Sequence, residues 1–164
     1  MRAELDEGDA LPDWREFAGM VVMGGPMGAY EEAAHPWLAE EKRVIGEAVA
    51  HGHPVWGVCL GAQLLAAALG AEVYRGAEAE VGLLPVELTP AAADDPVFGD
   101  APERLLTLQW HGDSFDLPSG ATLLARGASL TRSPSMRARP CRWRGGSSAA
   151  GWSVSSRMPA QSIG

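Results

Sequence analysis

The sequence predicts an α/β layered fold with a mostly parallel sheet. Short apolar runs alternate with amphipathic stretches through the first 125 residues, a pattern typical of successive strand–helix units. Most of these runs end at glycine-containing turn signals. The chain has 164 residues, of which 46% are hydrophobic and 21% charged, which suits one globular domain with a sizeable core.

Apolar spacing and helix-boundary residues place the individual elements. A helix is expected to open at His35-Pro36-Trp37, because proline is tolerated in a first helical turn, and to end at Gly52. A second helix is expected over residues 60–69, closed by Gly70. Strands are predicted at residues 19–23, 54–58, 83–88, 105–109 and 121–125.

Composition excludes several classes of protein. No apolar run approaches the roughly 18–20 residues that span a bilayer, and the first residues do not resemble a signal peptide. A net charge of −8 argues against nucleic acid or an anionic membrane as a partner. Cys59 and Cys141 are far apart and give neither a disulfide framework nor metal-ligand spacing. We therefore expect a cytoplasmic protein without a metal or other cofactor.

Charge divides the chain into two parts. All 21 acidic residues lie between Glu4 and Asp116, whereas only arginines carry charge after Leu117, in a stretch that is also rich in serine. This break predicts a domain over residues 1–128 and a basic tail over residues 129–164. We expect the tail to be disordered, or to be the product of a shifted reading frame; a natural basic tail is the alternative.

A cysteine stands where a tight strand-to-helix turn is expected. Gly57-Val58-Cys59-Leu60-Gly61 has the form of a nucleophile elbow, with cysteine in the place of serine. The start of the following helix favours a thiolate, and the N–H of Leu60 is placed to stabilise an oxyanion. Gly24-Gly25 could supply a second such N–H from a neighbouring loop. The alternative is a cysteine that merely packs at a strand end.

His111 is the first candidate for a base that activates Cys59. It stands at a predicted strand end beside Gly112 and Asp113, and ligands bind where strand ends converge in such sheets. A positioning role for His111 carries equal weight. The other three histidines lie at helix boundaries, where structural or solvated roles are expected.

These motifs together resemble class I, or triad-type, glutamine amidotransferases. Residues 57–66 resemble the nucleophile signature, Met23-Gly24-Gly25-Pro26 the oxyanion loop, and Trp110-His111-Gly112-Asp113 the glutamine-site loop. Glu80-x-Gly82 matches a further pair common in the family. The resemblance covers residues 5–128 and is strongest to stand-alone proteins similar to the glutaminase domain of GMP synthase. It implies a doubly wound, flavodoxin-like sheet that is incomplete here, truncated at both ends.

The resemblance also implies a reaction and a set of roles. Cys59 would attack the side-chain amide of L-glutamine, release ammonia and form a glutamyl thioester that water hydrolyses to glutamate. Gly25 and Leu60 would supply the oxyanion N–H groups. Ammonia would pass to an acceptor on a synthetase subunit. The residues that would line the glutamine pocket are Gln63, Trp110, His111, Gly112 and Asp113.

Two departures from the family pattern qualify that reading. The family's base is a histidine in a later motif with a glutamate, but here no histidine follows His111 and no acidic residue follows Asp116. The resemblance also implies a strand and a helix that would precede residue 1, and we expect their loss to expose an apolar sheet edge.

Three interpretations follow. The favoured one is an amidotransferase-like chain without glutaminase activity, whether a non-catalytic binding protein or a degenerate fragment. In the second, His111 or a partner's histidine replaces the lost base. In the third, the chain is another cysteine-elbow enzyme, such as a γ-glutamyl hydrolase or a DJ-1-like enzyme.

Overall fold

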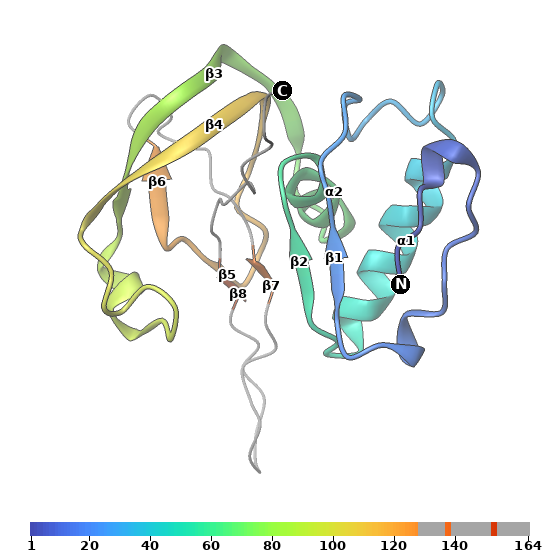
Figure 1. The fold of residues 1–164 in the computed structure, drawn as a ribbon, viewed down its shortest axis with the longest axis horizontal. Coiled ribbons are helices and arrows are strands. Elements are labelled where there is room, and N and C mark those ends of the chain that lie inside the picture. The colour runs from blue at the N-terminus through green and yellow to red at the C-terminus, as the bar shows by residue number, and fades with distance from the viewer. Residues whose placement is uncertain (128–136, 139–151, 154–164) are drawn as a thin grey trace.

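The computed structural model describes residues 1–127, 137–138 and 152–153, and these fall into two parts (Figure 1). The first part contains β1 (Met20–Val22), α1 (Trp37–Ala50), β2 (Val55–Gly57) and α2 (Leu60–Ala68). The second is dominated by the long strands β3 (Val73–Leu88) and β4 (Arg104–Phe115), with β6 (Ala125–Gly127) beside β3. The remaining described elements are the 3-10 helices η1 (Leu5–Glu7), η2 (Trp14–Glu16) and η3 (Pro90–Asp94), and the strands β5 (Ala121–Thr122), β7 (Arg137–Ala138) and β8 (Trp152–Ser153).

The strands form two sheets. One has the order β1-β2-β7-β8-β5, in which β1 and β2 are parallel and so are β5 and β8. The other has the order β4-β3-β6 and is antiparallel throughout. The predicted strand–helix–strand–helix order over residues 19–69 is confirmed. The antiparallel sheet is an addition that the alternating sequence pattern did not reveal.

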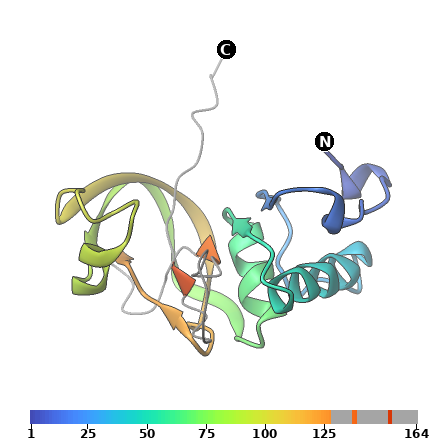
Figure 2. The same cartoon turned by 90° about the horizontal axis from the view of Figure 1, so that it is seen from below.

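The main core lies between β1, β2 and the two helices, which are adjacent in both views (Figures 1 and 2). Helix α1 is amphipathic and turns its apolar stripe inward, whereas α2 is apolar on nearly every side and is buried along most of its length. Phe115, the last residue of β4, is the one buried member of this core that comes from the β3–β4 ladder. The largest fully buried side chains in the core are Leu38, Ile45, Val55, Leu64 and Leu65.

Glu41, on α1, is half-buried, and burial raises the pKa of its carboxyl above the ordinary value of 4.5. Above that pH the charged form is therefore penalised in the folded state more than in the unfolded chain. We expect Glu41→Gln to increase the free energy of unfolding at pH 7, and the gain to vanish as the pH falls below 4.5, where Glu41 is neutral in both states. Urea denaturation at the two pH values measures this.

Glu40 provides the control, because it is exposed and its carboxylate accepts a 2.7 Å hydrogen bond from Arg43 Nε. That hydrogen bond lowers the pKa of Glu40, so the linkage has the opposite sign. Glu40→Gln should leave stability at pH 7 unchanged or lower it. Equal gains from both variants would contradict the assignment to burial.

Strands β3 and β4 are longer than the predicted strands at residues 83–88 and 105–109. Trp110, His111, Gly112 and Asp113 were expected in a loop at a strand end, and this expectation is wrong, because all four lie within β4. The ladder is irregular beside these residues, because it has a bulge in β3: Arg75 pairs with Asp113, but the next pair is Glu80 with His111. The intervening β3 residues absorb the change of register.

One face of the β3–β4 ladder is apolar and exposed. Val81 stands opposite Trp110, and Leu83 stands opposite Leu108. We call this surface the apolar stripe; it consists of Val81, Leu83, Leu106, Leu108 and Trp110, which are between 42% and 67% exposed. The ladder therefore leaves one of its two faces out of the core.

The predicted tail over residues 129–164 lies almost entirely outside the described residues, as does Cys141. Its described pieces are β7, which pairs with β2, and β8, which pairs with β5 and β7. The boundary at residue 128 and the origin of the tail stay predictions. In the part of the chain that the structure describes, no helix is both long and apolar enough to cross a membrane.

Candidate functional site

Cys59 has the backbone conformation of a strained turn. Its φ is 55° and its ψ is −117°, and it is the only non-glycine residue with positive φ among those described. It directly precedes α2, whose first turn begins at Leu60. The N–H groups of Ala62 and Gln63 donate to the Cys59 carbonyl, so the helix fixes the Cys59 backbone. The tight turn predicted for this cysteine is present, and its backbone conformation is strained.

Glycines on both sides make this turn sterically feasible. A Cβ on Gly57 would lie 2.4 Å from the Gly61 carbonyl oxygen, and one on Gly61 would lie 2.1 Å from the Val22 carbonyl oxygen. The backbone of β1 therefore runs directly against the start of α2. Any side chain at either glycine would separate these segments and move Cys59.

The strain at Cys59 predicts that glycine at this position gives a more stable protein than alanine does, the reverse of the usual order. Alanine is ordinarily more stable than glycine at a folded position, by about 0.5–1 kcal/mol. At positive φ a β-carbon is penalised, and a conformation of this kind costs of order 1–3 kcal/mol. We therefore expect Cys59→Gly to be more stable than Cys59→Ala, by about 1 kcal/mol, in urea denaturation. A higher urea midpoint for Cys59→Ala would contradict the strained geometry.

The Gly24-Gly25 loop lies directly against Cys59 and Leu60. A Cβ on Gly24 would be 3.3 Å from Cys59 Cβ and 3.7 Å from its Sγ, and one on Gly25 would be 2.9 Å from Leu60 Cδ2. This close approach depends on the absence of side chains at both positions. The loop after β1 and the elbow after β2 are thus adjacent, as their sequence motifs predict.

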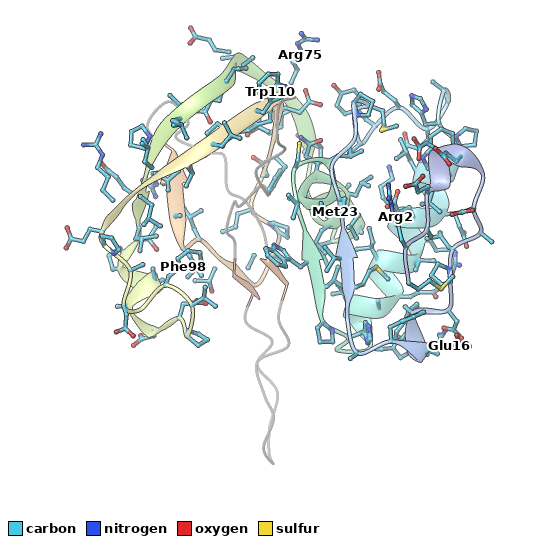
Figure 3. The ribbon with its side chains drawn as sticks, in the orientation of Figure 1. Arg2, Glu16, Met23, Arg75, Phe98 and Trp110 are labelled. Carbon is cyan, nitrogen blue, oxygen red and sulfur yellow. The ribbon has the colours of Figure 1, made fainter. Side chains whose placement is uncertain are left out.

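Strand β4 brings a third segment to the cysteine. The Sγ of Cys59 lies 3.9 Å from the carbonyl oxygen of Trp110. Figure 3 labels Trp110 on β4 and Arg75 on β3 at the same end of the ladder, and Met23, the residue directly after β1. The loop after β1, the start of α2 and the backbone of β4 therefore lie around one thiol that is partly accessible to solvent.

The His111 ring is held by oxygen atoms. Its Nδ1 lies 3.2 Å from the carbonyl oxygen of Asp113, and its Nε2 lies 3.1 Å from Gln109 Oε1 and 3.3 Å from Glu80 Oε2. Glu80 and Gln109 are both buried. The sequence motif placed His111 near the cysteine but gave no indication of these partners.

Asp113 and Tyr30 form the outer part of the site. Partial burial, together with the charge of the adjacent Asp113 carboxylate, raises the pKa of Tyr30. Tyr30 belongs to the loop after β1, so this contact joins that loop to β4. Gln63, on α2, is buried next to the elbow. Tyr30 was missed by sequence reasoning, because a single tyrosine in a loop carries no motif.

No group of three or more histidine, cysteine, aspartate or glutamate side chains in the described ranges is arranged to hold an ion. The chemistry available at the site is instead that of a thiol beside backbone N–H and carbonyl groups. Such a setting suits acyl transfer through a tetrahedral oxyanion.

Comparison with known proteins gives a consistent result. The sequence profile described as glutamine amidotransferase class-I matches residues 4–139. A glutamine amidotransferase-like protein of Salmonella typhimurium is 36% identical over 129 residues, which are 76% of this chain and 54% of that protein. A glutamine-hydrolysing GMP synthase of Thermomicrobium roseum is 38% identical over 114 residues, 67% of this chain and 19% of the relative.

Solved structures agree with the sequence matches. A glutamine amidotransferase of Thermotoga maritima superposes with a TM-score of 0.73 at 33% identity, covering 93% of this chain and 61% of that one. A glutamine amidotransferase of Methylobacillus flagellatus gives 0.67 at 36% identity, covering 76% and 49%. The flavodoxin-like α/β fold is thereby confirmed. The chain spans about half the length of the Salmonella relative and a smaller share of the GMP synthase.

Proposed function

Because the chain belongs to the class I glutamine amidotransferase family, we propose that it binds L-glutamine at Cys59 and forms a glutamyl thioester there. One observation carries the proposal: the Gly24-Gly25 loop, the strained elbow and the Trp110 carbonyl all meet at the Cys59 thiol. This is an arrangement for presenting a nucleophile to a carbonyl carbon. A cysteine that only packs in a core needs no strained backbone. It also needs no glycines that let neighbouring backbone segments come close to it.

In the proposed step, Cys59 Sγ attacks the side-chain amide carbon of glutamine. The amide oxygen becomes an oxyanion, which the N–H groups of Leu60 and Gly25 stabilise. The carbon–nitrogen bond then breaks, the nitrogen leaves as ammonia with the proton of the thiol, and a thioester joins Sγ to the former amide carbon, Cδ. Water hydrolyses the thioester to glutamate and regenerates the thiol. Gln63, Gly112 and Asp113 are the proposed contacts of the glutamine α-substituents.

Turnover is proposed to be very slow in this chain. The thiol proton must reach the leaving nitrogen, and no histidine follows His111 in the sequence to carry it. Loss of a positioned general base typically costs about 10²–10⁴-fold in rate. The chain is then a glutamine-binding member of its family with little glutaminase activity of its own. Ammonia that does form would serve a synthetase partner in the cytoplasm, by analogy with the GMP synthase relative.

A chloroketone analogue of glutamine tests the site directly. It alkylates a thiol held in a glutamine pocket, and peptide mapping then identifies the labelled cysteine. We expect labelling at Cys59 in preference to Cys141, slowed by added glutamine and abolished in Cys59→Ala. Equal labelling of both cysteines, with no protection by glutamine, would overturn the proposed site.

An ammonia-release assay with L-glutamine tests the activity separately. We expect release at the level of Cys59→Ala. Robust release that disappears in Cys59→Ala would contradict the proposed slow turnover, while leaving the glutamine site intact. A panel of γ-glutamyl peptides, assayed in the same way, tests the γ-glutamyl hydrolase alternative.

A further inference from the structure

We propose that Lys42 is a positioning residue that anchors the loop after β1, so that the Gly25 N–H stays directed at the oxyanion formed at Cys59. This loop, residues 23–36, crosses from the end of β1 to the start of α1 (Figure 1). That Lys42 anchors the loop follows from its contacts. That the anchor serves the oxyanion rests on the proposed function.

Lys42 reaches from α1 back to the loop that precedes the helix. Its Nζ donates a 2.9 Å hydrogen bond to the carbonyl oxygen of Ala29 and a second hydrogen bond to the carboxylate of Glu32. The second bond lowers the pKa of Glu32, as expected for a carboxylate that accepts from an ammonium group. The Lys42 side chain is only 18% exposed, so solvent screens these contacts less than it screens a surface ion pair.

The backbone of Ala29 depends on this contact. Ala29 is 1% exposed and belongs to the main core, so water has little access to its carbonyl. A buried carbonyl that loses its donor is costly, because it gave up its hydrogen bonds to water on folding. Lys42 therefore supplies the donor that allows the loop to enter the core at Ala29.

Close contacts connect Ala29 to Gly25. The Met27 side chain folds back over Gly25, where an added Cβ would lie 2.6 Å from Met27 Sδ. Met27 also packs against the main core. The Gly28 N–H donates to Glu31 Oε2 at 2.7 Å, and the Glu31 N–H donates to the Gly28 carbonyl at 3.1 Å. A displacement at Ala29 is therefore passed to Gly25 through this turn.

The first half of the loop has little else to hold it. Among the described residues, the backbone hydrogen bonds of this loop begin at Gly28, and residues 23–26 are exposed. Two successive glycines in that stretch give the backbone wide conformational freedom. The close approach of Gly25 to Leu60 therefore depends on the anchor at Ala29.

Arg43 provides a matched control. It is the next residue of α1, it is exposed, and its ion pairs with Glu40 and Glu47 stay within the helix. Lys42→Met and Arg43→Met each remove one positive charge from α1. Only Lys42→Met removes the hydrogen bonds that tie α1 to the loop.

Backbone ¹⁵N relaxation on the labelled full chain tests the anchor without any ligand. We expect order parameters near 0.85 at Gly25 and Gly28, the rigid range, and a fall below about 0.6 in Lys42→Met. Amides of α2 should stay rigid in that variant, and Arg43→Met should match the unsubstituted chain. A mobile Gly25 in the unsubstituted chain would overturn the proposal, even if Lys42→Met failed to fold. So would an unchanged Gly25 in Lys42→Met, or an equal loss of order in α2.

Two alkylating reagents test the effect on the site. Iodoacetamide needs only the Cys59 thiolate, whereas the chloroketone analogue of glutamine places its ketone oxygen where the oxyanion forms. We expect Lys42→Met to slow the chloroketone about tenfold, the effect of one misplaced hydrogen-bond donor, and to leave iodoacetamide within about twofold. Arg43→Met should leave both rates within about twofold.

Two outcomes of the alkylation experiment would overturn the proposal. One is a parallel fall of both rates in Lys42→Met, which would mean that the substitution disturbs the thiol itself. The other is an equal slowing of the chloroketone in Arg43→Met, which would make the effect one of helix charge. A chloroketone that does not select Cys59 in the unsubstituted chain would count against the proposed function, and the relaxation experiment would then decide the anchoring role of Lys42 by itself.

Discussion

We expect Gly61→Ala to lower the free energy of unfolding by more than about 3 kcal/mol. The new Cβ would lie 2.1 Å from the Val22 carbonyl oxygen and 2.6 Å from its carbon, both of them backbone atoms. They cannot move aside cheaply, because the Val58 N–H donates to the same carbonyl oxygen at 2.9 Å and ties β1 to the elbow. A urea denaturation curve measures the loss.

Gly46→Ala is the control for a glycine that packing does not require. It lies within α1, and its Cβ would meet the Ala68 carbonyl oxygen at 3.4 Å and Ala68 Cβ at 3.9 Å, which are ordinary contact distances. Alanine also gains up to about 1 kcal/mol over glycine inside a helix. We expect its midpoint to equal or exceed that of the unsubstituted chain. An unchanged midpoint for Gly61→Ala would mean that β1 and α2 are not as close as the structure places them.

Leu65→Ala should destabilise the chain by about 2–5 kcal/mol. Leu65 is completely buried on α2, in the core shared with α1. Truncation there removes packing that rigid neighbours cannot refill. Leu106→Ala makes the same chemical change at a site that is 67% exposed, and we expect its effect to stay within about 0.5 kcal/mol. Similar midpoints for the two variants would contradict the location of the core.

The sequence predicted the first part of the fold well because its signals are local. Pro36 marks the start of α1, glycines end both helices, and the short apolar runs before Gly24 and Cys59 are β1 and β2. The elbow was predictable for the same reason, since the constraint on Cys59 comes from the glycines two residues away on each side. No distant contact is needed to recognise it.

The second part depends on pairing, which a single sequence does not display. Trp110–Asp113 reads as a polar loop, and only the ladder with β3 shows it to be strand. The contact between Glu80 and His111 likewise requires the register change after Arg75. Glu80 and His111 are 31 positions apart in the sequence, and the bulge in β3 places them opposite each other. No sequence signature is strong enough to predict that bulge.

The location of the core has a consequence for how the molecule opens. The main core contains no fully buried side chain from between α2 and Phe115, and the apolar stripe of the β3–β4 ladder faces water. The ladder is therefore held by its own cross-strand bonds and by a few side chains buried outside the main core, Val86, Ala92 and Leu124, while β1, β2, α1 and α2 share a common interior. Amide hydrogens in β4 should exchange with solvent through openings that leave α2 protected. The nucleophile and the segment that contacts it thus belong to separate cooperative units.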